Sequence, residues 1–475
     1  MATCNQNTAI QQELASIVRA ANVLTASEST APYLKERRGR FDSETMCVVL
    51  PADVDEVSAI VRLCRERNRP IVPQGGNTGV CGGAVADAES VIINLQRMNR
   101  VRGVDETGYT MEVESGCILA DLQSVAIEHD MFLPLSLGAE GSCQIGGNLS
   151  TNAGGVNVLR YGNARDLVLG LEVVLPDGSV WNGMNSLRKN NTGYDLKNIF
   201  IGAEGTLGII TAAVLKLFPR PTNRATVMIA IESVPDALEL FSRTRKETSN
   251  FVSSFELMST VCVESAFRQI PDCSDFFPGQ VYPWYVLVEL GDSTEDGVSQ
   301  QLSERFLERA LDDGVILDAV VAQSERQSMQ MWRLREAIVE CQNYEGKSIK
   351  NDVSVPLSNI AQFIDRATAS VESMIPDVRC FAYGHIGDGN IHFNLSQPPN
   401  MDGNEFFDQW NAVCDAVHEI ADSLGGSFSA EHGIGLLKLR DMTRYKSTVE
   451  LNMMNSIKLA LDPDNIMNPG KVLPS

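Results

Sequence analysis

Three of the five histidines in this 475-residue chain lie in two short glycine-rich segments, and they are the first candidates for chemistry. His385 and His392 are seven residues apart in GHIGDGNIHFN, with an Asp-Gly turn between them. Glu431 and His432 are adjacent in AEHGIG. Two strands joined by that turn would bring both imidazoles to one side. Glu431 would then complete a metal site of two nitrogens and one oxygen, with coordination positions left open for catalysis.

The same residues also fit a purely structural interpretation. Histidines beside a turn often serve as hydrogen-bonding residues, and an Asp-Gly turn is ordinary hairpin chemistry. Glu431 and His432 lie between small residues and have no obvious packing use there, which favours a metal site. On spacing alone both interpretations stay open. His418 lies within an amphipathic helical pattern, and we expect it to be structural or exposed.

Glycine is concentrated in four stretches of the first half of the chain. They lie at 75–79, 82–83, 146–148 and 152–155. Missing Cβ atoms let backbone N–H groups converge and let a phosphate approach closely. One such cluster would be only a tight turn, but four in succession, two of them directly after apolar strands, indicate a nucleotide site. The chain has neither a phosphate-binding P-loop nor a Gly-x-Gly-x-x-Gly with its trailing acid, so another architecture would bind the nucleotide.

The elements expected around these residues divide the chain near Pro219 and Pro221. Before this point, short strands alternate with helices in an α+β pattern, and the helix over 53–68 has Asp53 as its N-cap. After it, the pattern predicts helices covering one face of an antiparallel sheet. The expected helices are 235–246, 294–312, 328–342, 358–374 and 405–424, and the expected strands include 227–231, 285–290 and a strand–loop–strand unit over 380–395.

Composition restricts the class of protein. The net charge is -22, from 61 acidic and 39 basic residues, so nucleic acid is not an expected partner. The 11 cysteines are scattered, which argues against disulfides and thiolate metal clusters and leads us to expect a cytoplasmic location. The first 24 residues lack the pattern of a signal or transit peptide, and no apolar run approaches the ~20 residues of a membrane span.

Four segments of the first half resemble the FAD-binding domain of the vanillyl-alcohol-oxidase superfamily. They are PQGGNTGVCGGAV, IGGNLSTNAGGVNVLRYGN, LVLGLEVVLPDG and IGAEGTLGIIT. The resemblance implies two α+β subdomains that hold an extended FAD, with the pyrophosphate on loop 75–79. Some members tether the flavin through a histidine where this chain has Asn77, so noncovalent FAD is expected. The implied FAD-binding residues are Pro73, Gly75, Gly76, Asn77, Thr78, Gly79, Gly138, Gly141, Gly146, Gly147, Thr151, Asn152, Gly154, Gly155, Glu204, Gly205, Ile210 and Asn468.

The second half resembles the C-terminal domain of FAD-linked D-2-hydroxy-acid dehydrogenases, above all the hydroxyglutarate-oxidising members. The resemblance rests on GHIGDGNIHFN, AEHGIG and the terminal LDPDNIMNPGK. It implies that His385, His392 and Glu431 bind a divalent metal, with zinc expected first and manganese, cobalt or iron as alternatives. It also implies that His432 is the catalytic base and that Asn394 contacts substrate.

The expected domains follow from both resemblances. They are an N-terminal helical segment (1–41), the FAD-binding domain (42–220), an antiparallel-sheet substrate and metal domain covered by helices (221–455), and a segment returning to the FAD domain (456–475). The implied reaction converts a D-2-hydroxy acid into the 2-oxo acid. The C2 hydrogen leaves as hydride to FAD, the metal lowers the pKa of the hydroxyl, and His432 takes its proton.

Two further segments bear on the substrate. WRLREAI and IKNDVSVP resemble the family segments that carry a carboxylate-binding arginine and lysine, which here are Arg335 and Lys350. Without the resemblance, Arg335 is expected to be a solvated helix residue. A cationic clamp beside a metal suggests a dicarboxylate, so D-2-hydroxyglutarate is expected first, with D-malate, D-lactate and glycolate as alternatives. Val339 departs from the threonine that hydroxyglutarate-oxidising members carry, which puts recognition of the distal carboxylate in doubt.

Two other functions fit part of the same sequence. A flavoprotein subunit that only relays electrons could dispense with the ligands and base that this chain retains. An oxidase that reduces O₂ directly is not distinguished by the sequence. The expected electron acceptor is a quinone, an electron-transfer flavoprotein or another carrier, and relatives lead us to expect a homodimer.

Overall fold

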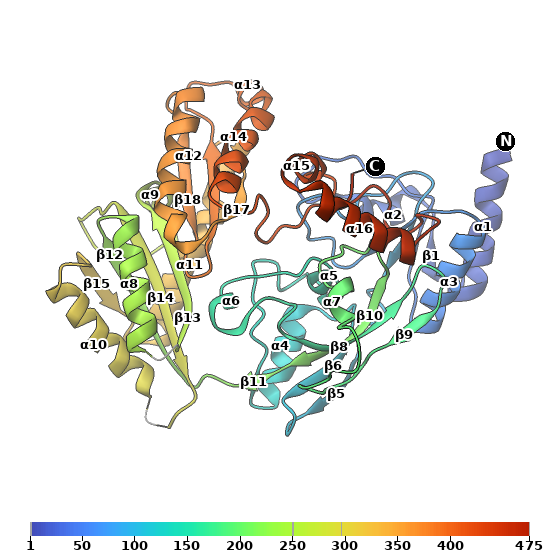
Figure 1. Cartoon of the computed structure of the whole chain (residues 1–475), viewed down its shortest axis with the longest axis horizontal. Coiled ribbons are helices and arrows are strands. Elements are labelled where there is room, and N and C mark those ends of the chain that lie inside the picture. Colours follow the sequence, from blue (N-terminus) through green and yellow to red (C-terminus); the bar gives the residue numbers. More distant parts are fainter. Residues whose placement is uncertain (1, 249–250, 296, 475) are drawn as a thin grey trace. The chain divides into compact units, whose positions relative to one another are not determined.

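The computed structural model describes residues 2–248, 251–295 and 297–474, which form two compact units (Figure 1). Unit 1 comprises Met1–Gly154, Asn163–Pro219 and Glu431–Ser475. Unit 2 comprises Gly155–Gly162 and Arg220–Ala430. Each unit has its own hydrophobic core and is described by itself.

The first sheet of unit 1 has the order β1-β2-β4-β3, in which β2 and β3 run parallel to β4. Helix α3 packs its apolar stripe, with Val57, Ile60, Val61 and Cys64 buried, into the core of this sheet. It begins after Asp53, whose side chain accepts a hydrogen bond from the backbone N–H of Glu56, so the predicted helix and N-cap are confirmed. The bounds are β1 Val23–Leu24, β2 Cys47–Val49, β3 Ile71–Gln74, β4 Val91–Asn94, α1 Ala2–Val18, α2 Ser27–Leu34 and α3 Val54–Glu66.

The second sheet of unit 1 is antiparallel, in the order β5-β6-β10-β8-β9. Strand β8, which lies between β10 and β9, is buried along its whole length, as the continuous apolar run VLGLEVV predicts for a strand covered on both faces. The bounds are β5 Val101–Asp105, β6 Thr110–Glu114, β7 Met131–Phe132, β8 Val168–Val174, β9 Val180–Asn182, β10 Ile209–Lys216, β11 Phe218–Pro219, α4 Leu119–Glu128, α5 Ile145–Ser150, α7 Lys197–Phe200, α15 Leu439–Tyr445 and α16 Thr448–Leu461.

Unit 2 is built on a sheet in the order β15-β12-β14-β13-β18-β19-β16, with β17 also paired to β19. All these pairings are antiparallel. The bounds are β12 Asn223–Ile231, β13 Val252–Ser259, β14 Trp284–Asp292, β15 Asp318–Val321, β16 Ser348–Ile349, β17 Asp352–Ser354, β18 Arg379–His385, β19 Asn390–Ser396, α6 Val158–Tyr161, α8 Val234–Glu247, α9 Thr260–Gln269, α10 Val298–Asp312, α11 Glu325–Cys341, α12 Ile360–Met374, α13 Gly403–Asp408 and α14 Trp410–Ser423.

Helices cover both faces of this sheet, so the prediction that they cover one face is wrong. Val227 and Ile229 of β12 pack in the same core as α8, α10, α12 and α14. Met228 and Ala230, which point to the opposite face, pack in a second core with α9 and α11. Successive side chains of β12 point to opposite faces of the sheet, so this one strand contributes to two cores.

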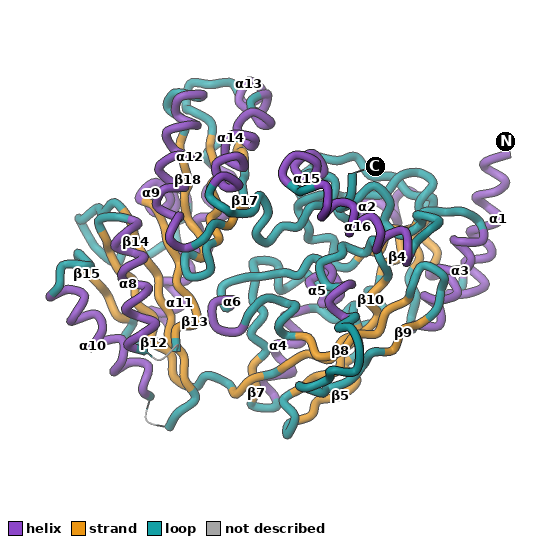
Figure 2. Tube along the Cα trace, in the orientation of Figure 1, coloured by secondary structure: helices purple, strands orange, loops and turns teal. Residues whose placement is uncertain are grey.

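The predicted helices differ from the observed ones in two details. The helix expected over 405–424 is broken into α13 and α14 at Gln409. The helix expected over 294–312 begins only at Val298, and residue 296 lies outside the described part of the chain. The segment between α14 and α15 has no regular helix or strand, as Figure 2 shows.

The division into units differs from the predicted domain boundaries in two places. Unit 2 ends at Ala430 rather than at 455, because α15 and α16 belong to unit 1. Residues 155–162, expected in the FAD-binding domain, belong to unit 2. The hydroxyl of Ser254 on β13 donates to the carbonyl of Val156, and Arg160 donates to the carbonyl of Gly291.

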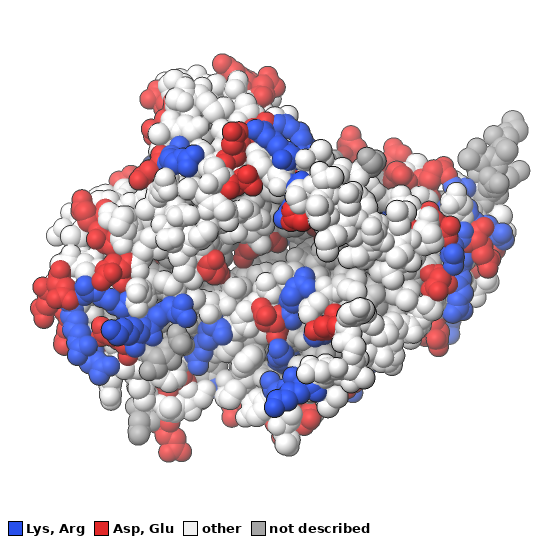
Figure 3. Space-filling view, in the orientation of Figure 1, with Lys and Arg blue, Asp and Glu red and all other residues white. Residues whose placement is uncertain are grey.

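Acidic and basic side chains lie beside one another in several places on the face shown in Figure 3. On the surface of unit 2 they form ion pairs such as Arg243 with Glu239 and Arg309 with Glu247. In the described part of the chain, no helix has the length and apolar character needed to cross a membrane.

Candidate active site

The hairpin of β18 and β19 places His385 and His392 on the same side of the sheet. His392 lies directly opposite Tyr383 in the strand register, and His385 is two residues after Tyr383, so it points to the same face. The two imidazole ring centroids are 5.7 Å apart. The turn between the strands needs Gly389, which has φ +88° and whose added Cβ would lie 2.3 Å from the carbonyl oxygen of Val355.

Each histidine faces a carboxylate on the neighbouring strand. Glu256 of β13 is opposite His385, and its Oε1 lies 2.7 Å from Nδ1 of that imidazole. Asp352 of β17 is opposite His392, and its Oδ1 lies 3.4 Å from Nδ1 of that imidazole. Because both Nδ1 atoms face a carboxylate, Nε2 of each ring is the nitrogen left for a metal.

The carboxylate of Glu256 is buried and ionised. Burial raises the pKa of Glu256, but the charges and hydrogen bonds of His385 and Arg335 outweigh it and hold this pKa at about 2. Nε and Nη2 of Arg335 lie 3.0 and 2.9 Å from Oε2 of the glutamate. An ionised carboxylate only accepts hydrogen bonds, so Nδ1 of His385 donates a hydrogen bond to Glu256 and Nε2 is the ring nitrogen available to a metal.

The third expected ligand is close to the two histidines. One ligand atom from each of His385, His392 and Glu431 lies within 4.8 Å of the others. Two donors that each bind an ion at ~2.1 Å are at most ~4.2 Å apart, so a small adjustment would let all three bind one ion. The backbone N–H of Ala430 donates to the carbonyl of Asp352, which holds the chain next to Glu431 beside the strand that supports His392. The donor set fits a divalent metal with open positions.

Of the residues expected to recognise the substrate, Arg335 lies on α11 and Lys350 lies on a short segment between two strands. Arg335 is buried on α11, and its guanidinium lies 4.9 Å from the ring centroid of Tyr383 in addition to its bond with Glu256. Lys350 lies in the short segment between β16 and β17. Val339, on α11, is 48% exposed.

Asn394 is held by protein partners. Its Nδ2 donates to Oε1 of Gln342 and to the hydroxyl of Tyr383, and its Oδ1 accepts from the backbone N–H of Asn351. Burial raises the pKa of Tyr383 to about 12, so the hydroxyl at the centre of this network stays protonated. The amide of Asn394 therefore braces the strand that carries His392.

The glycine loops of unit 1 have the shape expected of a nucleotide cradle. An added Cβ at Gly76 would lie 2.2 Å from the carbonyl of Ser142, and one at Gly146 would lie 2.6 Å from Cβ of Ser115, so these loops pack closely. By contrast, the Cβ positions of four expected FAD-binding glycines open onto space with no atom within 4 Å. These are Gly79, Gly138, Gly141 and Gly147.

Polar atoms at the same loops also fit a bound group. In the described part of the chain, Ser115 Oγ, Gln144 Oε1, Asn148 Oδ1 and Asn468 Oδ1 are buried without a hydrogen-bond partner. Buried polar atoms of this kind are normally satisfied, so a ligand with its own donors would complete them. The residues present therefore fit FAD.

Several expected FAD-binding residues use their side chains within the protein. Asn77 (φ +52°) donates to the carbonyls of Tyr33 and Lys35. The hydroxyl of Thr151 donates back to the carbonyl of Gly147, and Oδ1 of Asn152 accepts from the backbone N–H of Arg165. The remaining ones are placed as follows: Pro73 and Gly75 at the end of β3, Thr78 on the following loop, Gly154 after α5, Gly155 in unit 2, Gly205 against Pro73, and Ile210 buried in β10.

Glu204, also expected at the FAD, uses its carboxylate on the loop that follows His432. Its Oε1 and Oε2 accept hydrogen bonds from the backbone N–H groups of Ile434 and Gly435 at 2.7 and 2.8 Å. Asn468 donates to the backbone carbonyls of Glu204 and Gly83, which brings the C-terminal segment against these loops.

Sequence reasoning missed Glu256 and Asp352, the carboxylates that face the two histidines. Glu256 is 129 residues before His385 and has no local signal, because only the strand register brings the two together. Asp352 lies two residues after Lys350, in a segment already singled out, and its place in a short strand was the available signal.

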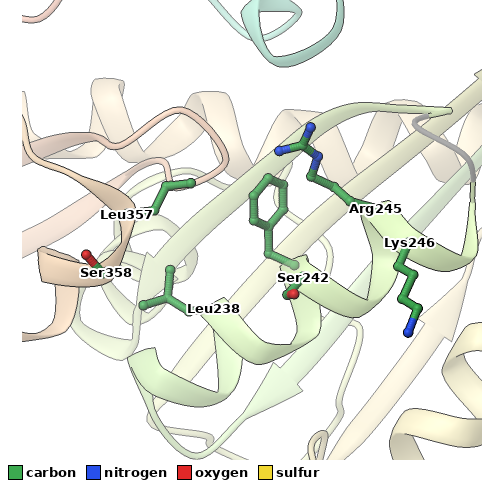
Figure 4. A pocket seen from close by; sticks show the side chains of 7 residues that line it. Leu238, Ser242, Arg245, Lys246, Leu357 and Ser358 are labelled. Carbon is green, nitrogen blue, oxygen red and sulfur yellow. The ribbon is translucent and has the colours of Figure 1, made fainter.

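A surface pocket of about 490 Å³ lies elsewhere on unit 2 and contains none of the expected site residues. Figure 4 shows Leu238, Ser242, Arg245 and Lys246 on α8, with Leu357 and Ser358 on the facing segment. Its lining combines a helix surface with two basic side chains and offers no metal ligand.

Comparison with known proteins places this geometry in a family. Residues 220–472 match the model of the C-terminal domain of FAD linked oxidases, and residues 45–183 match an FAD binding domain. The chain is 37% identical over 437 residues to a protein of Oryza sativa subsp. indica named probable D-2-hydroxyglutarate dehydrogenase, mitochondrial, covering 92% of this chain and 76% of that one. The chain belongs to the FAD-linked D-2-hydroxy-acid dehydrogenase family.

Other relatives of this dehydrogenase family cover as much of the chain. The mitochondrial D-2-hydroxyglutarate dehydrogenase of Danio rerio is 37% identical over 94% of this chain and 81% of its own length. The D-2-hydroxyglutarate dehydrogenase of Stutzerimonas stutzeri (strain A1501) is 35% identical over 98% of both chains. The protein is therefore an FAD-dependent oxidoreductase that acts on a CH–OH group.

Solved structures confirm the predicted fold class. p-Cresol methylhydroxylase aligns with a TM-score of 0.78 at 18% identity, covering 98% of this chain and 96% of that one. 4-Ethylphenol oxidase from Gulosibacter chungangensis aligns with a TM-score of 0.77 at 17% identity, covering 99% and 98%. These enzymes share the flavoprotein fold, and at this identity the likeness concerns the fold alone.

The expected cytoplasmic location is wrong by the same comparisons. Members of the dehydrogenase family from rice and zebrafish are named mitochondrial. The expectation rested on scattered cysteines. Unpaired thiols argue against an oxidising compartment but do not distinguish between compartments that keep thiols reduced.

Proposed function

We propose that this protein oxidises D-2-hydroxyglutarate to 2-oxoglutarate, with noncovalent FAD as hydride acceptor and a divalent metal at His385, His392 and Glu431. The observation that carries the proposal is the convergence of these three ligands, directly next to His432 in the chain. Zinc is the metal expected first, and manganese, cobalt or iron would accept the same donors.

His432 is the base of the proposed reaction. A divalent ion at this site would supply Lewis acidity, lowering the pKa of the substrate hydroxyl. The imidazole of His432 takes the hydroxyl proton as the hydrogen on C2 leaves with its electron pair, a contribution of roughly 10²–10⁴ in rate. One proton and one hydride leave together, so C2 becomes the carbonyl carbon of a 2-oxo acid.

The loops of unit 1 hold the proposed flavin. FAD would supply the two-electron acceptor that no side chain provides. The open sides of Gly79, Gly138, Gly141 and Gly147 leave room for it, and the buried oxygens of Gln144 and Asn148 offer it hydrogen-bond acceptors. A separate carrier, such as a quinone or an electron-transfer flavoprotein, would then reoxidise the flavin.

The choice of a dicarboxylate rests on the relatives and on two cations. The rice, zebrafish and Stutzerimonas proteins are all named for D-2-hydroxyglutarate. Lys350 would bind the distal carboxylate as a point charge, and Arg335 would offer its planar guanidinium. Arg335 also binds the carboxylate of Glu256.

Anaerobic flavin reduction tests the proposal. FAD-loaded protein is mixed with D-2-hydroxyglutarate, D-malate or D-lactate, and the loss of flavin absorbance is followed. The proposal expects D-2-hydroxyglutarate to reduce the flavin with the highest kcat/KM, and His432→Ala to keep FAD and metal while losing most of the rate. Faster reduction by D-lactate would contradict the substrate, and near-normal reduction in the His432→Ala variant would contradict the role of His432.

A further inference from the structure

Glu204 occupies a backbone conformation that few side chains adopt. Its φ is +51°, in the left-handed region, and such residues persist where the surrounding structure holds them. The backbone N–H of Glu204 donates to the carbonyl of Ser150, and its carbonyl accepts from Nδ2 of Asn468. These bonds come from segments far apart in the sequence and fix the direction in which the side chain leaves the backbone.

The carboxylate is committed to a second loop of unit 1. Each oxygen accepts one backbone N–H, from Ile434 at 2.7 Å and from Gly435 at 2.8 Å, and 230 residues separate Glu204 from the first of these. Burial raises the pKa of Glu204 above its ordinary value, and the two N–H groups and the charge of Lys438 offset this only in part. Charge-assisted bonds of this kind are shorter and stronger than neutral ones.

The glycines of this loop fit against the carboxylate and leave no room for a side chain. Gly433 has φ +75°, and an added Cβ would lie 2.7 Å from Oε1 of Glu204. Gly435 has φ +51°, and its added Cβ would lie 2.1 Å from the carbonyl of Cys81. That carbonyl also accepts the backbone N–H groups of Leu436 and Leu437, so the loop is held from two sides.

We infer that Glu204 is a positioning residue for His432, holding the base in place through the backbone of Ile434 and Gly435. This inference rests on the proposed function, because it takes His432 as the base. His432 is two residues before Ile434, so a shift of this loop moves the imidazole directly. Glu204 acts through the loop rather than on the flavin, since both of its carboxylate oxygens already accept a backbone N–H.

The test is Glu204→Gln in the FAD-loaded protein. Glutamine keeps the size of the side chain but turns an NH₂ group toward one of the two N–H donors, which breaks one bond and adds a repulsion. Asp292→Asn is the matched control. Asp292 is also buried and accepts one backbone N–H on each oxygen, from Thr294 and Ser299, but it lies far along the chain from the site residues.

Glu204→Gln is expected to lower the kcat for flavin reduction on the order of 10²-fold, because small displacements of a catalytic group are costly, with a much smaller change in KM. FAD content should match the wild type. Hydrogen–deuterium exchange at Ile434 and Gly435 should become faster. Asp292→Asn should leave kcat and this exchange unchanged.

A double-mutant cycle with His432→Asn separates the possible outcomes. If Glu204 acts through His432, the double variant will be no slower than His432→Asn alone. Wild-type kcat in Glu204→Gln, or losses that multiply in the double variant, would overturn the inference and leave the proposed function intact. Wild-type kcat in His432→Asn would overturn the proposed function and the inference with it.

A second variant tests the contact between Glu204 and the loop from the side of the loop. Gly433→Ala places a Cβ against the carboxylate of Glu204 and must reproduce the loss in kcat.

Discussion

At the scale of single residues, the site depends on carboxylates that touch the histidines rather than on the histidines alone. Glu256 accepts from Nδ1 of His385 and is itself held by Arg335. This arrangement directs Nδ1 of His385 to Glu256, leaves Nε2 as the nitrogen for a metal and restricts rotation of the ring. Asp352 likewise faces Nδ1 of His392, although its Oδ1 lies at the longer distance of 3.4 Å.

Replacing Glu256 by glutamine should therefore weaken metal binding more than it weakens the fold. The amide no longer requires a proton on Nδ1 of His385, and loss of such a partner typically costs 10–100-fold in metal affinity. Metal content after dialysis against a chelator, measured beside flavin absorbance, checks this. Glu345→Gln is the control, because Glu345 is a buried carboxylate that binds Arg268 and Arg379 and no histidine. Equal metal retention in both variants would contradict the role of Glu256.

Sequence reasoning identified the residues that carry their own local pattern. His385 and His392 stand in one glycine-rich segment, and Glu431 and His432 in another, so spacing and residue type were enough to single them out. Their partners were not predictable in this way. Glu256 lies in a buried strand whose sequence, VSSFELMS, reads as an ordinary strand, and only the pairing of β13 with β18 gives the glutamate a partner.

At the scale of elements, the hairpin of β18 and β19 is the part that fixes the site. Its turn depends on Gly389 for two reasons. The φ of Gly389 is +88°, and a backbone carbonyl lies where a Cβ would be placed. Gly314, also in unit 2, has φ +69° but has open space at the Cβ position. Both glycines therefore adopt a positive φ that disfavours a side chain, but only at Gly389 would an added Cβ collide with a neighbouring atom.

Gly389→Ala should destabilise the protein more than Gly314→Ala. Both pay ~1–2 kcal/mol for an alanine in the left-handed region. The clash with the carbonyl of Val355 should add about 1–3 kcal/mol at Gly389. Urea unfolding followed by tryptophan fluorescence measures the difference. Equal shifts in the two variants would show that the hairpin turn tolerates a side chain, contrary to this account.

The elements themselves were largely predictable, and the errors have physical causes. Period-3.6 patterns located α3, α8, α11 and α12, because each buries one stripe. The prediction of one covered sheet face failed although the signal was present. Met228 and Ala230 make the stretch from Val227 to Ile231 continuously apolar, and a continuous run predicts a strand covered on both faces. The return of α15 and α16 to unit 1 depends on long-range packing, which periodicity does not report.

At the scale of the whole molecule, buried carboxylates make the folded state sensitive to acid. In Glu345, the hydrogen bonds of Ser265, Arg268, Gln269 and Arg379 outweigh the effect of burial and hold the pKa at about 2, against an ordinary value of 4.5. The unfolded chain therefore binds more protons than the folded one between these values. The stabilisation is fully present above pH 4.5 and is lost as the pH falls toward 2.

The urea midpoint of unfolding should accordingly decrease between pH 5 and pH 3, and Glu345→Gln should decrease less. The glutamine variant should be less stable by about 1–3 kcal/mol at pH 7, because it leaves two arginines without their carboxylate, and the two proteins should approach each other in acid. Tryptophan fluorescence reports unit 2 through Trp284, Trp332 and Trp410. If the urea midpoints of the wild type and of Glu345→Gln fell in parallel with pH, Glu345 would not contribute to the acid sensitivity of the fold.

In the proposed mechanism, a metal held by His385, His392 and Glu431 is needed for hydride transfer to the flavin. Anaerobic reduction of the flavin by D-2-hydroxyglutarate, before and after chelation and again after adding zinc or manganese, tests it directly. We predict that chelation abolishes reduction while the flavin absorbance persists, that one added metal restores it, and that His392→Ala is not restored. Undiminished flavin reduction in metal-free protein would contradict the account.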